Sequence, residues 1–174
     1  MTELTPAPNP ARFGAYLLDK LVLLPLSIGL LYAVVIAKSL PLALVFLFFD
    51  ALYKPLLEAT AGQTLGKRWL GLRVVRGSDG GPISWNASLM RYLPWAAIFY
   101  CTVFVLVRHF QSPDFAAVND LETYLTFSRK HPLGDNFLIA LINYLPIFSV
   151  VWVFSDPLRR ALHDRLAGTV VIRG

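Results

Sequence analysis

Six ionisable residues stand in or beside the first two apolar stretches of the chain: Arg12, Asp19, Lys20, Asp50, Lys54 and Glu58. Arg12 and Asp19 are seven residues apart and therefore share one face of a helix. Asp50, Lys54 and Glu58 follow each other at intervals of four residues and form one helical stripe. Carboxylates held in apolar surroundings beside cations can take up and release protons or monovalent cations. The chemistry that this spacing suggests is ion binding.

Two interpretations of these charges remain open. On antiparallel helices Asp19 and Asp50 would reach about the same depth, roughly 10–12 Å inside the membrane. Arg12 would then be level with Glu58, with Lys54 between the two layers. In one interpretation the opposite charges neutralise each other and fix how the helices pack. In the other, Asp19 and Asp50 form a proton- or cation-binding pair whose affinity the neighbouring basic residues tune.

The elements that position these charges are membrane helices. Of the 174 residues, 56% are hydrophobic and 16% are charged, whereas a soluble domain carries about 25% charged residues. This composition excludes intrinsic disorder and argues against a nucleic-acid partner, despite the net charge of +5. The lone Cys101 excludes an internal disulfide framework and a cysteine-rich metal site. We therefore expect one all-α integral membrane domain over residues 1–174, with four transmembrane helices at residues 12–37, 40–57, 92–107 and 136–154.

Two of the segments between the helices are long, residues 59–91 and 108–135. Residues 1–10 are polar and proline-rich and predict a flexible tail. In the loop of residues 59–91, a surface helix at 62–70 precedes a β-hairpin that pairs 72–75 with 82–85 across a glycine-rich turn. Residues 84–86 predict the start of a second surface helix, which leads through Arg91 into the third span. Residues 108–135 form the loop on the other side and contain an amphipathic helix.

The tail of residues 155–174 is expected to fold back on the membrane surface. Asp156-Pro157 predicts a helix start, and Gly168 predicts its end. The β-branched residues 169–172 predict a strand whose natural partner is 72–75.

Basic residues predict the orientation. Ten of them gather in or near the loop of residues 59–91 and in the tail of residues 155–174: Lys54, Lys67, Arg68, Arg73, Arg76, Arg91, Arg159, Arg160, Arg165 and Arg173. The opposite side has four: Lys38, Arg108, Arg129 and Lys130. The positive-inside rule then places both termini in the cytoplasm.

The glycine-punctuated segment at residues 62–68 lacks the spacing and the Ser/Thr of a phosphate loop. It is better explained as a basic segment that grips lipid headgroups at the cytoplasmic surface. The residues expected at this surface are Gly62, Gln63, Thr64, Gly66, Lys67, Arg68 and Arg73. His163-Asp164 alone does not make a metal site and fits a salt-bridged surface helix. Without a catalytic triad or a cofactor fingerprint, we expect no enzymatic activity, no cofactor and no metal.

At its motifs the chain resembles the RDD family of small bacterial membrane proteins, named for one arginine and two aspartates. The resemblance rests on RFGAYLLD at residues 12–19, GQTLGKRWLGLRVV at 62–75 and DPLRRALHDRLAGT at 156–169. It maps the family's arginine onto Arg12 and its aspartates onto Asp19 and Asp164. A bidentate Arg12–Asp164 pair would clamp the tail to the mouth of the first two helices. The Lys67-Arg68 pair is the other basic partner open to Asp164. The resemblance implies a membrane domain with transport as a suggested role, and cation/proton exchange for some members.

The leading functional expectation is a bacterial inner-membrane protein that exchanges a monovalent cation against protons. Its ion-binding residues would be Asp19, Asp50, Arg12, Lys54 and Glu58. Since no paired repeat is visible, a working pathway would require a homo-oligomer. The alternative is a non-transporting module that binds a partner protein or anionic lipid through its basic cytoplasmic face.

Overall fold

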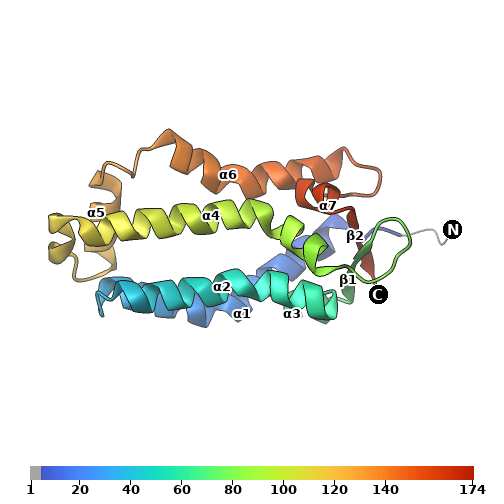
Figure 1. The fold of residues 1–174 in the computed structure, drawn as a ribbon, viewed down its shortest axis with the longest axis horizontal. Coiled ribbons are helices and arrows are strands. Elements are labelled where there is room, and N and C mark those ends of the chain that lie inside the picture. Colours follow the sequence, from blue (N-terminus) through green and yellow to red (C-terminus); the bar gives the residue numbers. More distant parts are fainter. Residues whose placement is uncertain (1–4) are drawn as a thin grey trace.

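Four long helices lie side by side along the molecule in a computed structural model that describes residues 5–174 (Figure 1). They are α1 (Asn9–Val35), α2 (Leu40–Ala61), α4 (Trp85–Gln111) and α6 (Phe137–Val151). All four are long and apolar enough to cross a membrane, α6 together with the 3-10 turn η2 (Trp152–Phe154) that continues it. The predicted all-α membrane class with four spans is confirmed.

The helices pack in a row, with α1 against α2, α2 against α4, and α4 against α6. The link from α1 to α2 is tight, because Lys38 adopts a left-handed conformation with φ 45° and Ser39 caps α2. At its other end α2 stops at Gly62, which has φ 68°. This left-handed glycine turns the chain back toward α1.

A two-stranded antiparallel sheet joins the middle of the chain to its end. Strand β1 (Leu72–Arg76) pairs with β2 (Thr169–Arg173), in a register that sets Val74 opposite Val171. The predicted pairing of the tail strand with residues 72–75 is therefore confirmed, and the tail is docked.

The predicted hairpin between residues 72–75 and 82–85 is wrong. The turn does form, since Arg76 N donates to Gly81 O over 2.8 Å, but no second strand follows it. Pro82 has no N–H to donate to a ladder. Two residues later, Ser84 accepts a hydrogen bond from Ala87 N and starts α4. The predicted helix start at residues 84–86 is therefore confirmed, and α4 runs without a break into the third span, which was predicted to begin seven residues later.

The N-terminal segment is tied to the sheet. Of the expected flexible tail, residues 1–4 lie outside the described part of the chain. Pro6 forms a bridge to Ile172, and Ala7 N donates to Val171 O over 2.9 Å. Since α1 begins at Asn9, the prediction of a free tail is wrong for residues 6–10.

Two short helices, α3 (Leu65–Trp69) and α7 (Leu162–Leu166), flank the sheet. Helix α3 is shorter than the predicted 62–70, because Gly62 belongs to the end of α2 and Thr64 is the cap of α3. The predicted helix start at Pro157 is wrong, and α7 begins five residues later. The carboxylate of Asp156 accepts hydrogen bonds from Leu158 N and Arg160 N and holds this stretch in a turn. Gly168, at φ 64°, ends the helical segment as predicted.

The two ends of the bundle differ. The sheet end carries β1, β2, α3, α7 and both termini (Figure 1). The loop end carries the 3-10 helix η1 (Pro113–Ala117) and α5 (Leu121–Lys130), the amphipathic helix expected in the loop of residues 108–135. Phe115 and Val118 of this loop pack into a cluster with the ends of α1, α2 and α4. A second cluster, which includes Leu72 and Val171, supports the sheet.

Candidate functional site

The stripe of charges on α2 faces the interior of the bundle, as predicted. Glu58 is fully buried, and Asp50 and Lys54 are half-buried. The Lys54 ammonium lies 3.5 Å from the ring centroid of Trp95 in α4, a cation–π contact. Lys54 therefore points from α2 toward α4.

Glu58 is the end of this stripe and is held by two cations. Its Oε2 accepts a hydrogen bond from Arg91 Nε over 2.8 Å, and its Oε1 pairs with Lys67 of α3. Both carboxylate oxygens are thus occupied, and α2 is joined to α3 and α4 at one buried point.

Arg91 is the hub of the network. Its side chain is 1% exposed and lies at the second turn of α4. Besides Glu58, it binds Asp164 of α7 and donates to Thr169 Oγ1 of β2 over 2.6 Å. One turn earlier, Ser88 Oγ donates to the carbonyl oxygen of Pro55 over 2.8 Å and fixes α4 against α2. One guanidinium therefore ties three distant parts of the chain together.

Asp164 receives cations from two sides. Its Oδ1 pairs with Arg91, and its Oδ2 accepts from Arg12 Nη1 over 3.3 Å and from Ala161 N over 3.1 Å. Burial alone would raise the pKa of this carboxyl group, but the charges of Arg91 and Arg12 outweigh it and hold the pKa well below its usual value. Asp164 is thus a fixed negative charge at neutral pH.

The predicted Arg12–Asp164 pair exists, although it is not bidentate. The other contacts of Arg12 are donations to Arg159 O over 2.6 Å and to Val171 O over 3.1 Å. Arg12 clamps the tail through its backbone as well as through Asp164. Lys67, the other basic partner considered for Asp164, pairs with Glu58 instead.

The salt bridge expected at Asp164 is present, but its expected position on a surface helix is wrong. Asp164 is 1% exposed, because α7 packs its acidic side against α4. Its neighbour His163 is also enclosed: Nδ1 lies 2.8 Å from Ser149 Oγ, and the ring meets Trp95 edge-on with centroids 4.8 Å apart. Burial lowers the pKa of His163 well below 6.5, so this imidazole is neutral at pH 7.

Asp19 is held by three neutral donors. Tyr53 OH and Thr64 Oγ1 each donate over 2.6 Å, and Gly66 N donates over 2.8 Å. Helix α3 comes this close to α1 because residue 66 has no side chain, since a Cβ there would collide with the carbonyl oxygen of Ala15. The carboxylate of Asp19 therefore docks α3 on α1.

Not all residues of the glycine-punctuated segment lie at the surface. Thr64 is 2% exposed and Gly66 is buried, which corrects the expectation that both face lipid headgroups. Lys67 is turned toward Glu58. Arg68 and Arg73 are exposed, as expected, and Gly62 and Gln63 lie between these extremes.

Asp19 and Asp50 do not form a pair. The hydrogen bonds of Asp19 come from Tyr53, Thr64 and Gly66, and the charge that acts on Asp50 is that of Lys20, not that of Asp19. Within residues 5–174, Asp50 has no hydrogen bond or ion pair, although the positive charge of Lys20 acts on it. Asp50 is the carboxylate of the stripe that has no fixed partner in the described chain.

Sequence reasoning missed Arg91, the central residue. The start at residues 84–86 of a helix through Arg91 is confirmed, but this helix was expected at the membrane surface, and Arg91 was counted only toward the charge of the cytoplasmic side. An ionisable residue inside a membrane helix requires a buried partner.

Of three comparisons with known proteins, one gave a match. The sequence model of the RDD family matches residues 6–168, which include Arg12, Asp19 and Asp164. No curated protein and no solved structure was found to match the chain. With a match over nearly its whole length, this multi-pass membrane protein belongs to the RDD family.

Proposed function

We propose that this protein exchanges a monovalent cation against protons across the bacterial inner membrane, without any enzymatic step. The observation that carries the proposal is the stripe of charges on the inner face of α2, which consists of Asp50, Lys54 and Glu58. Charges placed inside a membrane bundle are costly, and they commonly mark ion pathways.

Asp50 is the residue best suited to exchange. Glu58 and Asp164 are each bound by two cations, and Asp19 accepts three hydrogen bonds. Asp50 has no such contacts among the described residues and lies half-buried in the middle of an apolar helix. A carboxylate in this position can take a proton or a cation without first breaking an ion pair.

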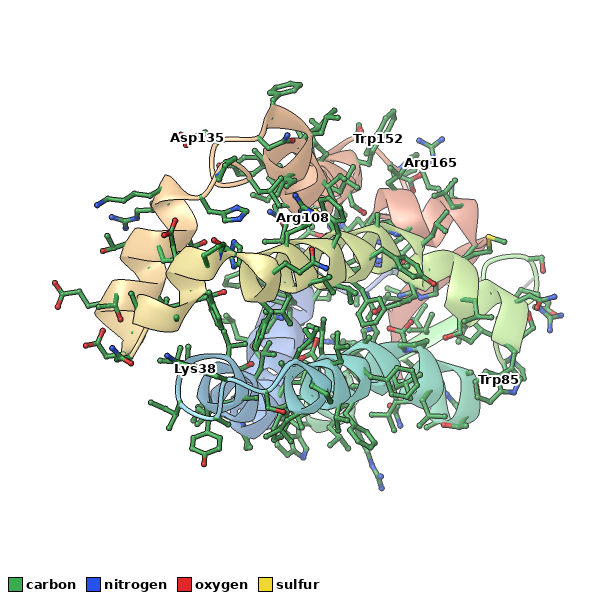
Figure 2. The ribbon with its side chains drawn as sticks, turned by 60° about the vertical axis from the view of Figure 1, so that its left-hand side comes forward. Lys38, Trp85, Arg108, Asp135, Trp152 and Arg165 are labelled. Carbon is green, nitrogen blue, oxygen red and sulfur yellow. The ribbon has the colours of Figure 1, made fainter. Side chains whose placement is uncertain are left out.

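The surroundings of the sheet end support an orientation with both termini in the cytoplasm. Exposed arginines gather there, and three exposed tryptophans, Trp69, Trp85 and Trp152, lie at helix ends. Figure 2 shows Trp85 and Arg165 at this end, far from Lys38. Tryptophans are enriched at the headgroup level, and basic residues on the cytoplasmic side.

The test is ion flux in proteoliposomes that contain the full chain. Sodium, potassium or lithium is added outside, and an internal pH dye reports proton movement. We expect cation-dependent proton movement that Asp50→Asn lowers at least about tenfold, while the exposed Asp79→Asn leaves it unchanged. Equal flux in wild type and Asp50→Asn would contradict the proposal, as would the absence of flux with all three cations.

A second candidate function is binding of anionic lipid or of an acidic partner protein by the sheet end. Four exposed arginines there have no acidic side-chain partner within residues 5–174: Arg68, Arg73, Arg159 and Arg173. Mass spectrometry of the protein released from nanodiscs would show retained phosphatidylglycerol. In this case replacing Arg68 and Arg73 by Gln would reduce the retained lipid, whereas Asp50→Asn would have no effect on it.

A further inference from the structure

Asn143 is an amide without a partner on the outside of α6. The span of residues 137–154 has the highest mean hydropathy of the four, 2.2, yet Asn143 is exposed about 9 Å along the helix from Phe137. Within residues 5–174 its side chain makes no hydrogen bond, whereas Ser149 of the same helix is bonded to His163. An amide facing hydrocarbon without a partner is strongly unfavourable, because lipid tails offer no donor or acceptor.

Helix α6 lies at the edge of the row of helices, where α4 is its main neighbour (Figure 1). The side turned toward the bundle carries its least exposed residues: Ile139, Ile142, Leu145, Ser149 and Val153. The remaining circumference is exposed, and Asn143 belongs to it. The fold of one chain therefore leaves most of α6 uncovered.

One line of residues on this uncovered surface has the spacing of a helix–helix seam. Its members alternate at intervals of three and four residues and are all exposed: Ala140, Asn143, Ile147, Val150 and Phe154. At 3.6 residues per turn, the line is about a third of a turn away from the side that packs on α4. Alternation of three and four residues is the pattern by which two membrane helices pack at a small crossing angle.

We propose that α6 pairs with α6 of a second copy of this chain along this seam, with Asn143 bonded to its counterpart. Two copies inserted in the same orientation are related by a two-fold axis along the membrane normal, which brings identical seam positions together. A carboxamide both donates and accepts, so two Asn143 side chains satisfy each other across the axis. The small Ala140, one turn away, permits close approach of the backbones. A single polar seam position also fixes the register of the pair.

Cysteine cross-linking in native membranes tests the geometry. In a Cys101→Ser background, single cysteines are introduced by Ala140→Cys, Ile147→Cys and, as a control on the exposed face of α4, Phe104→Cys. Copper phenanthroline should give disulfide-linked dimers at the two seam positions and not at the control. Equal linkage at all three sites would show random collision, and no linkage at the seam would show that lipid or another protein covers α6; either result overturns the proposal.

The role of the amide is tested by dimer affinity, measured by energy transfer between labelled copies of the full chain in liposomes. Asn143→Leu should raise the dissociation constant about tenfold. Asn143→Gln, which keeps the amide, should restore part of the affinity, and Asn86→Leu at the exposed start of α4 should have no effect. An unchanged constant in Asn143→Leu would overturn the proposal. Neither experiment measures ion flux, so failure of this dimer seam can be distinguished from failure of the proposed exchange.

Discussion

Replacing Arg91 by Met tests whether the buried ion network holds the tail on the bundle. The substitution keeps an unbranched side chain that reaches about as far as Nε and removes the guanidinium. Glu58 would keep Lys67 as its cation and Asp164 would keep Arg12, but both carboxylates would lose the bonds to Arg91. Thr169 Oγ1 would lose its donor as well.

The expected loss can be estimated from these bonds. A hydrogen bond to a charged group contributes about 1.5–3 kcal/mol, and Arg91 makes one to each of two carboxylates. Breaking a buried ion pair by removing one partner costs about 3–5 kcal/mol. Two such bonds together contribute about 3–6 kcal/mol, which overlaps with the cost of breaking a buried ion pair. Arg91→Met should therefore lower the free energy of unfolding by about 3–5 kcal/mol.

The measurement is reversible unfolding in mixed micelles by added dodecyl sulfate, followed by tryptophan fluorescence. Arg76→Met is the matched control, because Arg76 pairs with Asp79 over 3.0 Å but both side chains are about half exposed, 51% and 53%. An exposed pair of this kind contributes about 0–1 kcal/mol. If Arg91→Met costs no more than Arg76→Met, the network does not secure the tail and the reasoning is refuted.

Two further predictions use the same unfolding measurement. Arg12→Gln and Asp164→Asn, made singly and together, should show a coupling of about 0.5–3 kcal/mol, since the two side chains share an ion pair; strictly additive losses would contradict that contact. Burial lowers the pKa of His163 in the folded chain well below 6.5. Below pH 6.5 this imidazole therefore binds a proton in the unfolded chain and stays neutral in the folded chain. Stability should therefore fall from pH 6.5 to pH 5 by at most about 1.4 kcal/mol per pH unit from this residue, and His163→Gln should remove that part of the slope; an identical slope in the variant would contradict it.

The spans could be predicted from sequence because membrane insertion depends on local composition. About 20 apolar residues suffice to define a span, and no distant contact is needed to recognise one. The ends of the helices are harder to predict, because they depend on capping residues. Ser84 caps α4, which therefore starts at Trp85. Gly62 ends α2 four residues after the fully buried Glu58.

The sheet shows the limit of local signals. A glycine-rich turn at residues 77–81 predicts a hairpin, and the turn is present, but β1 takes its partner from the far end of the chain. The alternating buried residues Leu72 and Val74 have to be covered, and β2 brings Val171 to the same cluster. The choice between a near and a distant strand depends on packing against the helices, which the sequence of the loop does not contain.

The two interpretations of the intramembrane charges apply to different parts of the site. Neutralisation explains Glu58 and Asp164, since each is bound by two cations, and Asp164 stays ionised. It does not explain Asp50, which lies two turns further along the same face of α2 and has no such partner among residues 5–174. A stripe selected only for packing would be expected to end in a satisfied pair, because an unpaired charge lowers stability and adds no contact. The difference between Glu58 and Asp50 is therefore the reason to assign packing to the sheet end and to propose ion exchange for the middle of the bundle.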